Sequence, residues 1–166
     1  MTSKKAFKND DLVSIIIINF NGGDYILDCI KSVFNTIDCN FEVILVDNNS
    51  TDNSSNLSKE QFKEIRFFQS DKNLGMAARN IGLDNVLGNF TVFLDADTVV
   101  PPNWISILLS SHQQHGQGLY QGKLLKKDNP KIIESGGDMA NVFGTGFARG
   151  RGEKDIGNYE TFQKIS

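Results

Sequence analysis

Residues 90–97 read FTVFLDAD, an apolar run of strand length that ends in two aspartates. In an extended chain, side chains two residues apart point to the same side, so Asp95 and Asp97 can face one ligand. Neighbouring carboxylates repel each other unless a cation lies beside them, and their hard oxygens suit Mg²⁺ or Mn²⁺, with substrate phosphates as further ligands. The pattern predicts a divalent-cation site. The alternative is two ordinary loop acids, one of them capping the turn before Pro101.

Three further runs of strand length precede residues 90–97 and alternate with stretches of helical spacing. The expected strands are Leu12–Phe20, Phe41–Val46, Ile65–Gln69 and Phe90–Leu94. The expected helices are Tyr25–Ile37, a short helix reaching about Phe62, Met76–Val86 and Trp104–Ser111. This order is typical of an α/β fold in which helices flank a mostly parallel sheet and right-handed crossovers join the strands.

The alternation of strands and helices stops near Leu119. Leu119–Leu125 and Ile132–Ser135 could form strands, but Gly136–Gly157 is rich in glycine and has no clear period. Because a chain of 166 residues has the length of one compact domain and no repeat, low-complexity tract or internal boundary divides it, we expect a single domain over residues 1–166.

The composition is that of a soluble globular protein, and it limits the partners. The 166 residues carry a formal net charge of −3, with 39% hydrophobic and 22% charged residues. Proteins that bind nucleic acids commonly have an excess of basic residues, which displace counterions from the phosphates. This chain has no such excess, so a nucleic acid is not an expected partner. Two cysteines are too few for a disulfide scaffold, and the apolar run Ile15–Ile18 is far too short for a signal sequence or a membrane span. We therefore expect a cytoplasmic protein.

Polar residues follow each predicted strand, at the edge where open α/β sheets bind ligands. They are Asn19–Asn21, Asp47–Ser50, Ser70–Asn73 and Asp95–Asp97. Asp47 and Asn48 could bond a base edge or a ribose, although such a run of Asn, Ser, Thr and Asp more often forms Asx turns and helix caps. Arg79 could reach a diphosphate from a helix that opens with the small residue Gly75, or it could form a surface ion pair.

Four segments follow one another in a characteristic order, namely VSIIIINFNGGDYILDCIKSV, FEVILVDNNSTDNS, KNLGMAARNIGL and NFTVFLDADTVVPPNWI. Together they resemble the family 2 inverting glycosyltransferases, near their bacterial rhamnosyltransferase-like branch. These enzymes have the GT-A fold of nucleotide-diphospho-sugar transferases. The similarity is strong from about Leu12 to Leu109 and weaker through ESGGDMANVFGTGFARGRGEKDIGNYE. Any one motif would be weak, but four in order are highly specific.

The resemblance implies a role for each residue that matches the family motifs. The implied nucleotide-binding residues are Ile18, Phe20, Asn21, Asp47, Asn48, Gly75, Arg79, Asp95 and Ala96. The first three would contact the nucleobase, and Asp95 would lie toward the ribose. Asp97, together with Asp95, would hold Mg²⁺ or Mn²⁺ and so neutralise the leaving diphosphate. Many family members have a second aspartate where this chain has Asn48, which leaves the base unassigned.

The implied activity is inverting transfer of a sugar from a UDP- or dTDP-linked donor to a saccharide or lipid-linked acceptor, in bacterial surface polysaccharide synthesis. The implied donor-binding part covers about residues 12–112, and an acceptor-side region starts over about 118–166, so the C-terminal part of the GT-A fold would be incomplete. This chain has no expected transmembrane segment, and the full enzyme could associate with the inner face of the membrane.

Inversion also needs a general base that takes the proton from the acceptor hydroxyl. In the family this acid lies well downstream of the DxD motif, so we expect the base beyond Ser166 and the chain to be part of a longer enzyme.

One alternative function is that of a non-catalytic nucleotide-sugar-binding module or an inactive fragment. Another is a different α/β enzyme, such as a methyltransferase. That would need a Gly-rich turn after the first strand, which Gly22-Gly23 offers only weakly, and would leave Asp95 and Asp97 unexplained.

Overall fold

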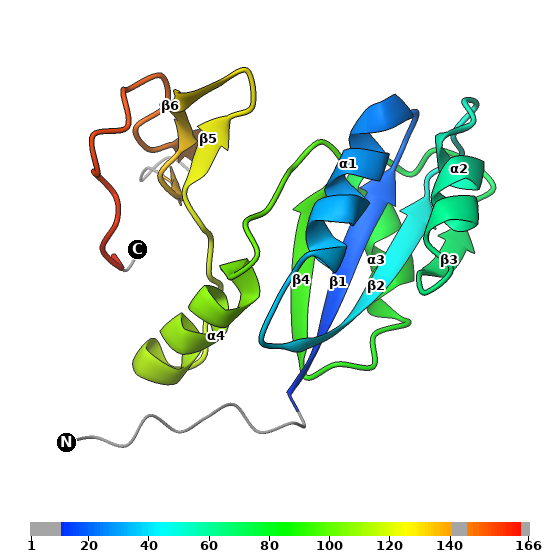
Figure 1. The fold of residues 1–166 in the computed structure, drawn as a ribbon, viewed down its shortest axis with the longest axis horizontal. Coiled ribbons are helices and arrows are strands. Elements are labelled where there is room, and N and C mark those ends of the chain that lie inside the picture. Colours follow the sequence, from blue (N-terminus) through cyan, green and yellow to red (C-terminus); the bar gives the residue numbers. More distant parts are fainter. Residues whose placement is uncertain (1–10, 141–145, 164–166) are drawn as a thin grey trace. The chain divides into compact units, whose positions relative to one another are not determined.

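In the part of the chain that the computed structural model describes, residues 11–140 and 146–163, four parallel strands form a sheet (Figure 1). They are β1 (Leu12–Asn19), β2 (Asn40–Asp47), β3 (Arg66–Gln69) and β4 (Phe90–Asp95). Their order is β3-β2-β1-β4, and every pairing is parallel. The predicted α/β fold with a mostly parallel sheet is therefore confirmed.

Helices cover both faces of this sheet (Figure 1). α1 (Gly23–Phe34) and α2 (Ser54–Gln61) contact each other, whereas the 3₁₀ turn η1 (Gly75–Ala77) leads into α3 (Ala78–Leu83), which contacts β1 and β2. α1 and α3 lie on opposite sides of the strands. The chain therefore crosses from one face of the sheet to the other between β2 and β4.

β1 lies inside the sheet and is buried on both faces. Because side chains alternate along a strand, Ile16 and Ile18 face one side and Ile15 and Ile17 face the other. Ile16 packs against Ala78 of α3, while Ile15 and Ile17 are fully buried on the opposite side. This two-sided burial is why the strand sequence is apolar throughout rather than alternating.

The chain divides between Ile105 and Ser106 into two compact units. The second unit holds most of α4 and two antiparallel strand pairs, β5 with β6 and β7 with β8. These elements are α4 (Trp104–His115), β5 (Leu124–Lys126), β6 (Asn129–Ser135), β7 (Asp138–Ala140) and β8 (Gly146–Ala148).

The sequence reading of the second unit is partly wrong. The strand expected over Leu119–Leu125 begins only at Leu124, and Leu119 is fully exposed outside any strand. The expected strand Ile132–Ser135 is confirmed as the end of β6, where Ile133 is fully buried. β5 is exposed, and β6 is buried only toward its end. The sequences of these two strands therefore show little apolar pattern.

Lys123, the residue that precedes β5, binds the C-terminal segment of the second unit through its side chain. Its Nζ donates to both carboxylate oxygens of Asp155 at 3.0 Å and also bonds Glu160. The Lys123 side chain is only 15% exposed. Hydrogen bonds from Lys123 and from the Gly157 N–H lower the pKa of Asp155.

α1 and α4 have 12 residues each. Within the described ranges, no helix has the length and apolar character needed to cross a membrane.

Candidate functional site

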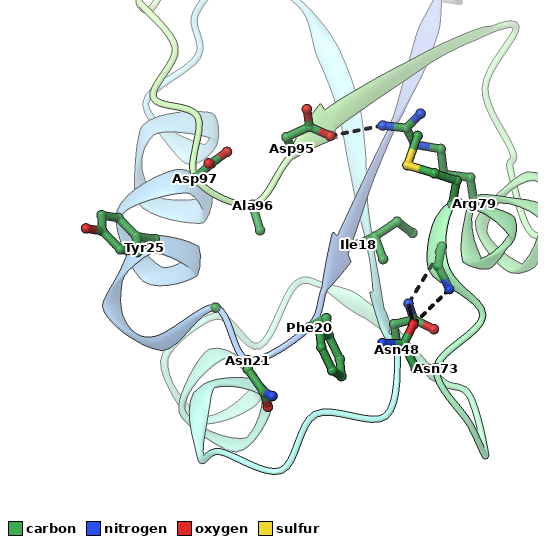
Figure 2. A pocket seen from close by; sticks show the side chains of 13 residues that line it. Ile18, Phe20, Asn21, Tyr25, Asn48, Asn73, Arg79, Asp95, Ala96 and Asp97 are labelled. Atoms are coloured by element: carbon green, nitrogen blue, oxygen red, sulfur yellow. Dashed lines mark hydrogen bonds and ion pairs between the residues drawn. The ribbon is translucent and has the colours of Figure 1, made fainter. Parts of the chain in front are cut away.

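A pocket of about 520 Å³ opens at the carboxyl ends of β1, β2 and β4, wholly within the first unit (Figure 2). Open parallel sheets bind ligands at this edge, where connections leave neighbouring strands in different directions. The lining residues are Ile18, Phe20, Asn21, Gly22, Tyr25, Asn48, Asn73, Gly75, Met76, Arg79, Asp95, Ala96 and Asp97. Every residue predicted to bind nucleotide or metal is among them except Asp47.

One end of the pocket is charged. Arg79 Nη2 of α3 lies 2.9 Å from Asp95 Oδ1 at the end of β4, and its guanidinium lies over the Phe93 ring, 5.3 Å from the ring centroid. The Asp95 carboxylate is 73% exposed, while the Arg79 side chain is 29% exposed. The ion pair therefore holds the guanidinium at the pocket wall, with the carboxylate open to a ligand.

Asp97 lines the same end of the pocket and is exposed. Among the described residues, it has no ion-pair partner, and no three His, Cys, Asp or Glu side chains gather closely enough to hold a metal alone. A cation here would need further oxygen ligands from a diphosphate and water, as Mg²⁺ commonly takes. Asp97 and Asp95 therefore fit a divalent cation that is bound together with a nucleotide.

The other end of the pocket carries an aromatic ring and side-chain amides. Figure 2 shows Phe20, Asn48 and Asn73 well away from Asp95 and Arg79, with Ile18 between the two groups. Phe20 is 48% exposed, which is high for a large apolar ring. Such a ring offers a flat surface on which a planar group can stack.

Asp47 lies beneath the site rather than in the pocket. In the strand register Asp47 is beside Asn19, and both side chains point toward α2. The Asp47 carboxylate is buried and accepts a hydrogen bond from Ser55 Oγ at 2.7 Å. Because side chains alternate, the next residue, Asn48, points to the other side and reaches the pocket.

Asn19 anchors the loops that carry the pocket. Its Nδ2 donates to Ser54 Oγ and Ser55 Oγ, each at 2.8 Å, and its Oδ1 accepts from the Gly22 N–H at 3.2 Å. The Asn19 side chain is fully buried, so each of these bonds replaces water. One buried amide thus joins the end of β1, the turn before α1 and the first turn of α2.

A second link joins the same two loops at the surface. Asn21 Oδ1 accepts from the Thr51 N–H at 2.7 Å, and the Gly23 N–H donates to Asp52 Oδ2 at 3.0 Å. Burial by itself would raise the pKa of Asp52, but hydrogen bonds from Ser54 and Gly23 outweigh it and lower that pKa. Asn21 has a φ of +53°, a left-handed conformation that asparagine tolerates better than most residues.

Replacing Asn19 with alanine is expected to destabilise the protein by about 1–3 kcal/mol, because buried serine and backbone groups lose their partner. For a domain of this size, each kcal/mol corresponds to roughly 2–4 °C in melting temperature. Thermal melts of Asn19→Ala and of the exposed control Asn80→Ala test this. Equal melting temperatures for the two variants would contradict an anchoring role for Asn19.

Four pocket residues were absent from the sequence prediction, namely Gly22, Tyr25, Asn73 and Met76. Tyr25 stood in the predicted amphipathic helix, and Asn73 stood in a loop where asparagine usually makes turns. The available signal for Asn73 was its position at the end of the third strand, on the same sheet edge as the other polar strand ends.

A family model described as glycosyl transferase family 2 matches residues 14–156. Over 153 residues the chain is 31% identical to an uncharacterized glycosyltransferase of Rickettsia conorii, covering 86% of this chain and 24% of that protein. Over 90 residues it is 39% identical to the teichoic acid poly(glycerol phosphate) polymerase of Staphylococcus epidermidis, covering 51% of this chain and 12% of the polymerase. The chain thus spans about a quarter or less of the length of these relatives.

Solved structures share the fold at low sequence identity. S. aureus TarS 1-349 in complex with UDP-GlcNAc has a TM-score of 0.55 and 21% identity, covering 70% of this chain and 41% of that one. The mannosyltransferase PcManGT from Pyrobaculum calidifontis, in complex with GDP-Man and Mn²⁺, has a TM-score of 0.57 and 19% identity. The match covers 78% of this chain and 35% of the mannosyltransferase chain. The predicted GT-A fold is confirmed by these likenesses.

Proposed function

The chain belongs to glycosyl transferase family 2, and on that premise we propose that its pocket binds a nucleotide-diphospho-sugar, UDP- or dTDP-linked. The observation that carries the proposal is the division of one pocket into a charged end and an aromatic, amide-lined end. A nucleoside diphosphate has the same division, with a planar base at one end and two phosphates at the other. The solved structures that hold UDP-GlcNAc and GDP-Man support a nucleotide-diphospho-sugar as the ligand, and the first of them supports a UDP-linked one.

In the proposed complex the base lies against Phe20 and the diphosphate lies beside Arg79. A guanidinium can donate two parallel hydrogen bonds to phosphate oxygens, which fixes both position and orientation. Arg79 is already held in place by Asp95 and by the Phe93 ring, so it loses little side-chain freedom when it binds.

Asp97 and Asp95 would hold Mg²⁺ or Mn²⁺, and the Mn²⁺ in the mannosyltransferase structure supports a cation at this kind of site. When bound, such a cation supplies Lewis-acid neutralisation of the leaving diphosphate. The chain's own part is to place two carboxylates at the end of β4, near the guanidinium of Arg79. Arg79 adds a second positive charge for the same leaving group.

For the whole protein we propose inverting transfer to a saccharide or lipid-linked acceptor in bacterial surface polysaccharide synthesis. The similarity to a teichoic acid polymerase supports this role. A lipid-linked acceptor would place the enzyme at the inner face of the membrane. The acids lining the pocket, Asp95 and Asp97, are both assigned to the cation, and Asp95 also pairs with Arg79, so we assign the general base to an acid outside the pocket.

The rival function is a module that binds a nucleotide-sugar without transferring it. Such a module would share the pocket, so binding alone does not separate the two functions. Turnover of a nucleotide-sugar donor in the presence of a saccharide acceptor does. Turnover supports the transferase, whereas tight binding without turnover supports the module.

Nucleotide binding should raise the melting temperature of the chain by roughly 5–10 °C. A ligand at 100 times its dissociation constant stabilises the folded state by about 2.7 kcal/mol, and each kcal/mol is worth roughly 2–4 °C at this size. Melting curves with UDP, dTDP and GDP, each with Mn²⁺ or Mg²⁺, measure the shift. If none of the three nucleotides shifts the melting temperature, the chain has no donor site.

A further inference from the structure

Two backbone N–H groups fix the orientation of the Asn48 and Asn73 side-chain amides. The Leu74 N–H donates to Asn48 Oδ1 at 2.8 Å, and the Gly75 N–H donates to Asn73 Oδ1 at 2.8 Å. A backbone N–H can only donate, so the acceptor oxygen of each amide must face it. Asn48 Nδ2 then donates to Asn73 Oδ1 at 2.9 Å, which agrees with both assignments.

This arrangement uses the Asn48 amide internally and leaves the Asn73 amide nitrogen for a ligand. Asn48 is only 3% exposed, and its Oδ1 and Nδ2 both bond the segment Asn73–Gly75. Asn73 is exposed and lines the pocket, and no described acceptor lies within hydrogen-bond distance of its Nδ2. Asn48 is thus a positioning residue that holds Asn73 by its oxygen.

The position of Asn73 is at the end of the pocket where a base would lie. Figure 2 shows Asn73 beside Asn48 and near Phe20, away from Asp95 and Arg79. A base stacked on Phe20 would present its polar edge to neighbouring side-chain groups. Between the Asn48 and Asn73 amides, only that of Asn73 still has a donor directed away from the other. The Asn21 amide, on the other side of Phe20 in Figure 2, is held by its oxygen, which accepts from the Thr51 N–H.

We propose that the Asn73 amide donates a hydrogen bond to the nucleobase and selects bases with a carbonyl group over bases with an amino group at the same ring position. The proposal rests on the proposed nucleotide-binding function and adds a specificity-determining residue to it. Uracil, thymine and guanine present a carbonyl oxygen where cytosine and adenine present an amino group. An amide N–H₂ facing an amino group leaves two donors opposed, so the hydrogen bond is lost and binding of that base is weaker.

UDP and CDP form the sharpest test, because they have the same charge and differ only at the base edge. The unaltered chain should bind UDP roughly tenfold more tightly than CDP. In Asn73→Asp the Oδ1 that accepts from Gly75 and Asn48 is kept, while the outward donor becomes an acceptor. Calorimetric titration should then show the preference for UDP abolished or reversed. The added negative charge weakens both nucleotides equally and cancels in the ratio.

Asn80→Asp is the matched control, since it adds the same charge on α3 at an exposed residue outside the pocket lining. It should keep the UDP-to-CDP ratio of the unaltered chain. Asn73→Ala, which removes the donor without adding charge, should lower UDP affinity to the level of CDP. An unchanged ratio in both Asn73 variants overturns this inference while leaving the proposed function intact. Failure of the unaltered chain to bind any nucleotide overturns both.

Discussion

Replacing Asp97 with alanine is expected to abolish the part of UDP binding that depends on Mn²⁺. Asp97 is exposed at the charged end of the pocket and has no ion-pair partner among the described residues, so its carboxylate is open to a cation. Asp95 would be the one remaining carboxylate at that end, and it is already paired with Arg79. Titrations of UDP with and without Mn²⁺ should therefore give the same affinity in Asp97→Ala.

The fold should survive this substitution, because an exposed residue just past a strand end contributes little to the core. Asp84→Ala is a suitable control, since it removes one exposed aspartate at the end of α3, outside the pocket. That variant should retain the full effect of Mn²⁺. A cation effect of normal size in Asp97→Ala would remove Asp97 from the metal site.

The sheet could be predicted because its central strands are buried on both faces. Continuous apolar runs such as Leu12–Asn19 then stand out from amphipathic helices in the sequence. The helix predicted over Met76–Val86 is longer than the observed α3, which spans Ala78–Leu83. The segment opens as a 3₁₀ turn whose first residue, Gly75, has a φ of +56°, and near its end Asn85 Nδ2 donates to the Ile81 carbonyl at 2.8 Å. Such local side-chain bonds carry no periodic signal.

The sheet edge that forms the pocket was also predictable, but the direction of each side chain was not. Asp47 and Asn48 are adjacent in the sequence, and the sequence pattern predicts either of them as a ligand-binding residue. In the observed register of β2 with β1, the Asp47 side chain points toward Ser55 and the Asn48 side chain points toward Asn73. Choosing between two neighbouring polar residues requires the strand register, which one sequence does not provide. Asn73 lies beyond the end of β3, and its amide is oriented by Asn48 and by the Gly75 N–H, contacts that the sequence pattern does not reveal.

Replacing Arg79 with methionine is expected to weaken UDP binding by about 10- to 150-fold, which corresponds to about 1.5–3 kcal/mol for a lost charge-assisted hydrogen bond. Methionine keeps an unbranched apolar stem that can still cover Phe93, over which the guanidinium lies. The loss should therefore reflect the diphosphate contact rather than a collapsed pocket wall. Titrations of UDP and of uridine against the same protein measure it.

Uridine is the internal control, because it shares the base and ribose but has no phosphates for Arg79 to bind. Its affinity should change little in Arg79→Met, and the ratio of UDP to uridine affinity should fall by nearly the whole effect. Arg79→Lys retains the charge but not the planar fork, so it should recover part of the loss and not all of it. Equal losses for UDP and uridine would mean that Arg79 supports the pocket through Asp95 and Phe93 without touching the phosphates.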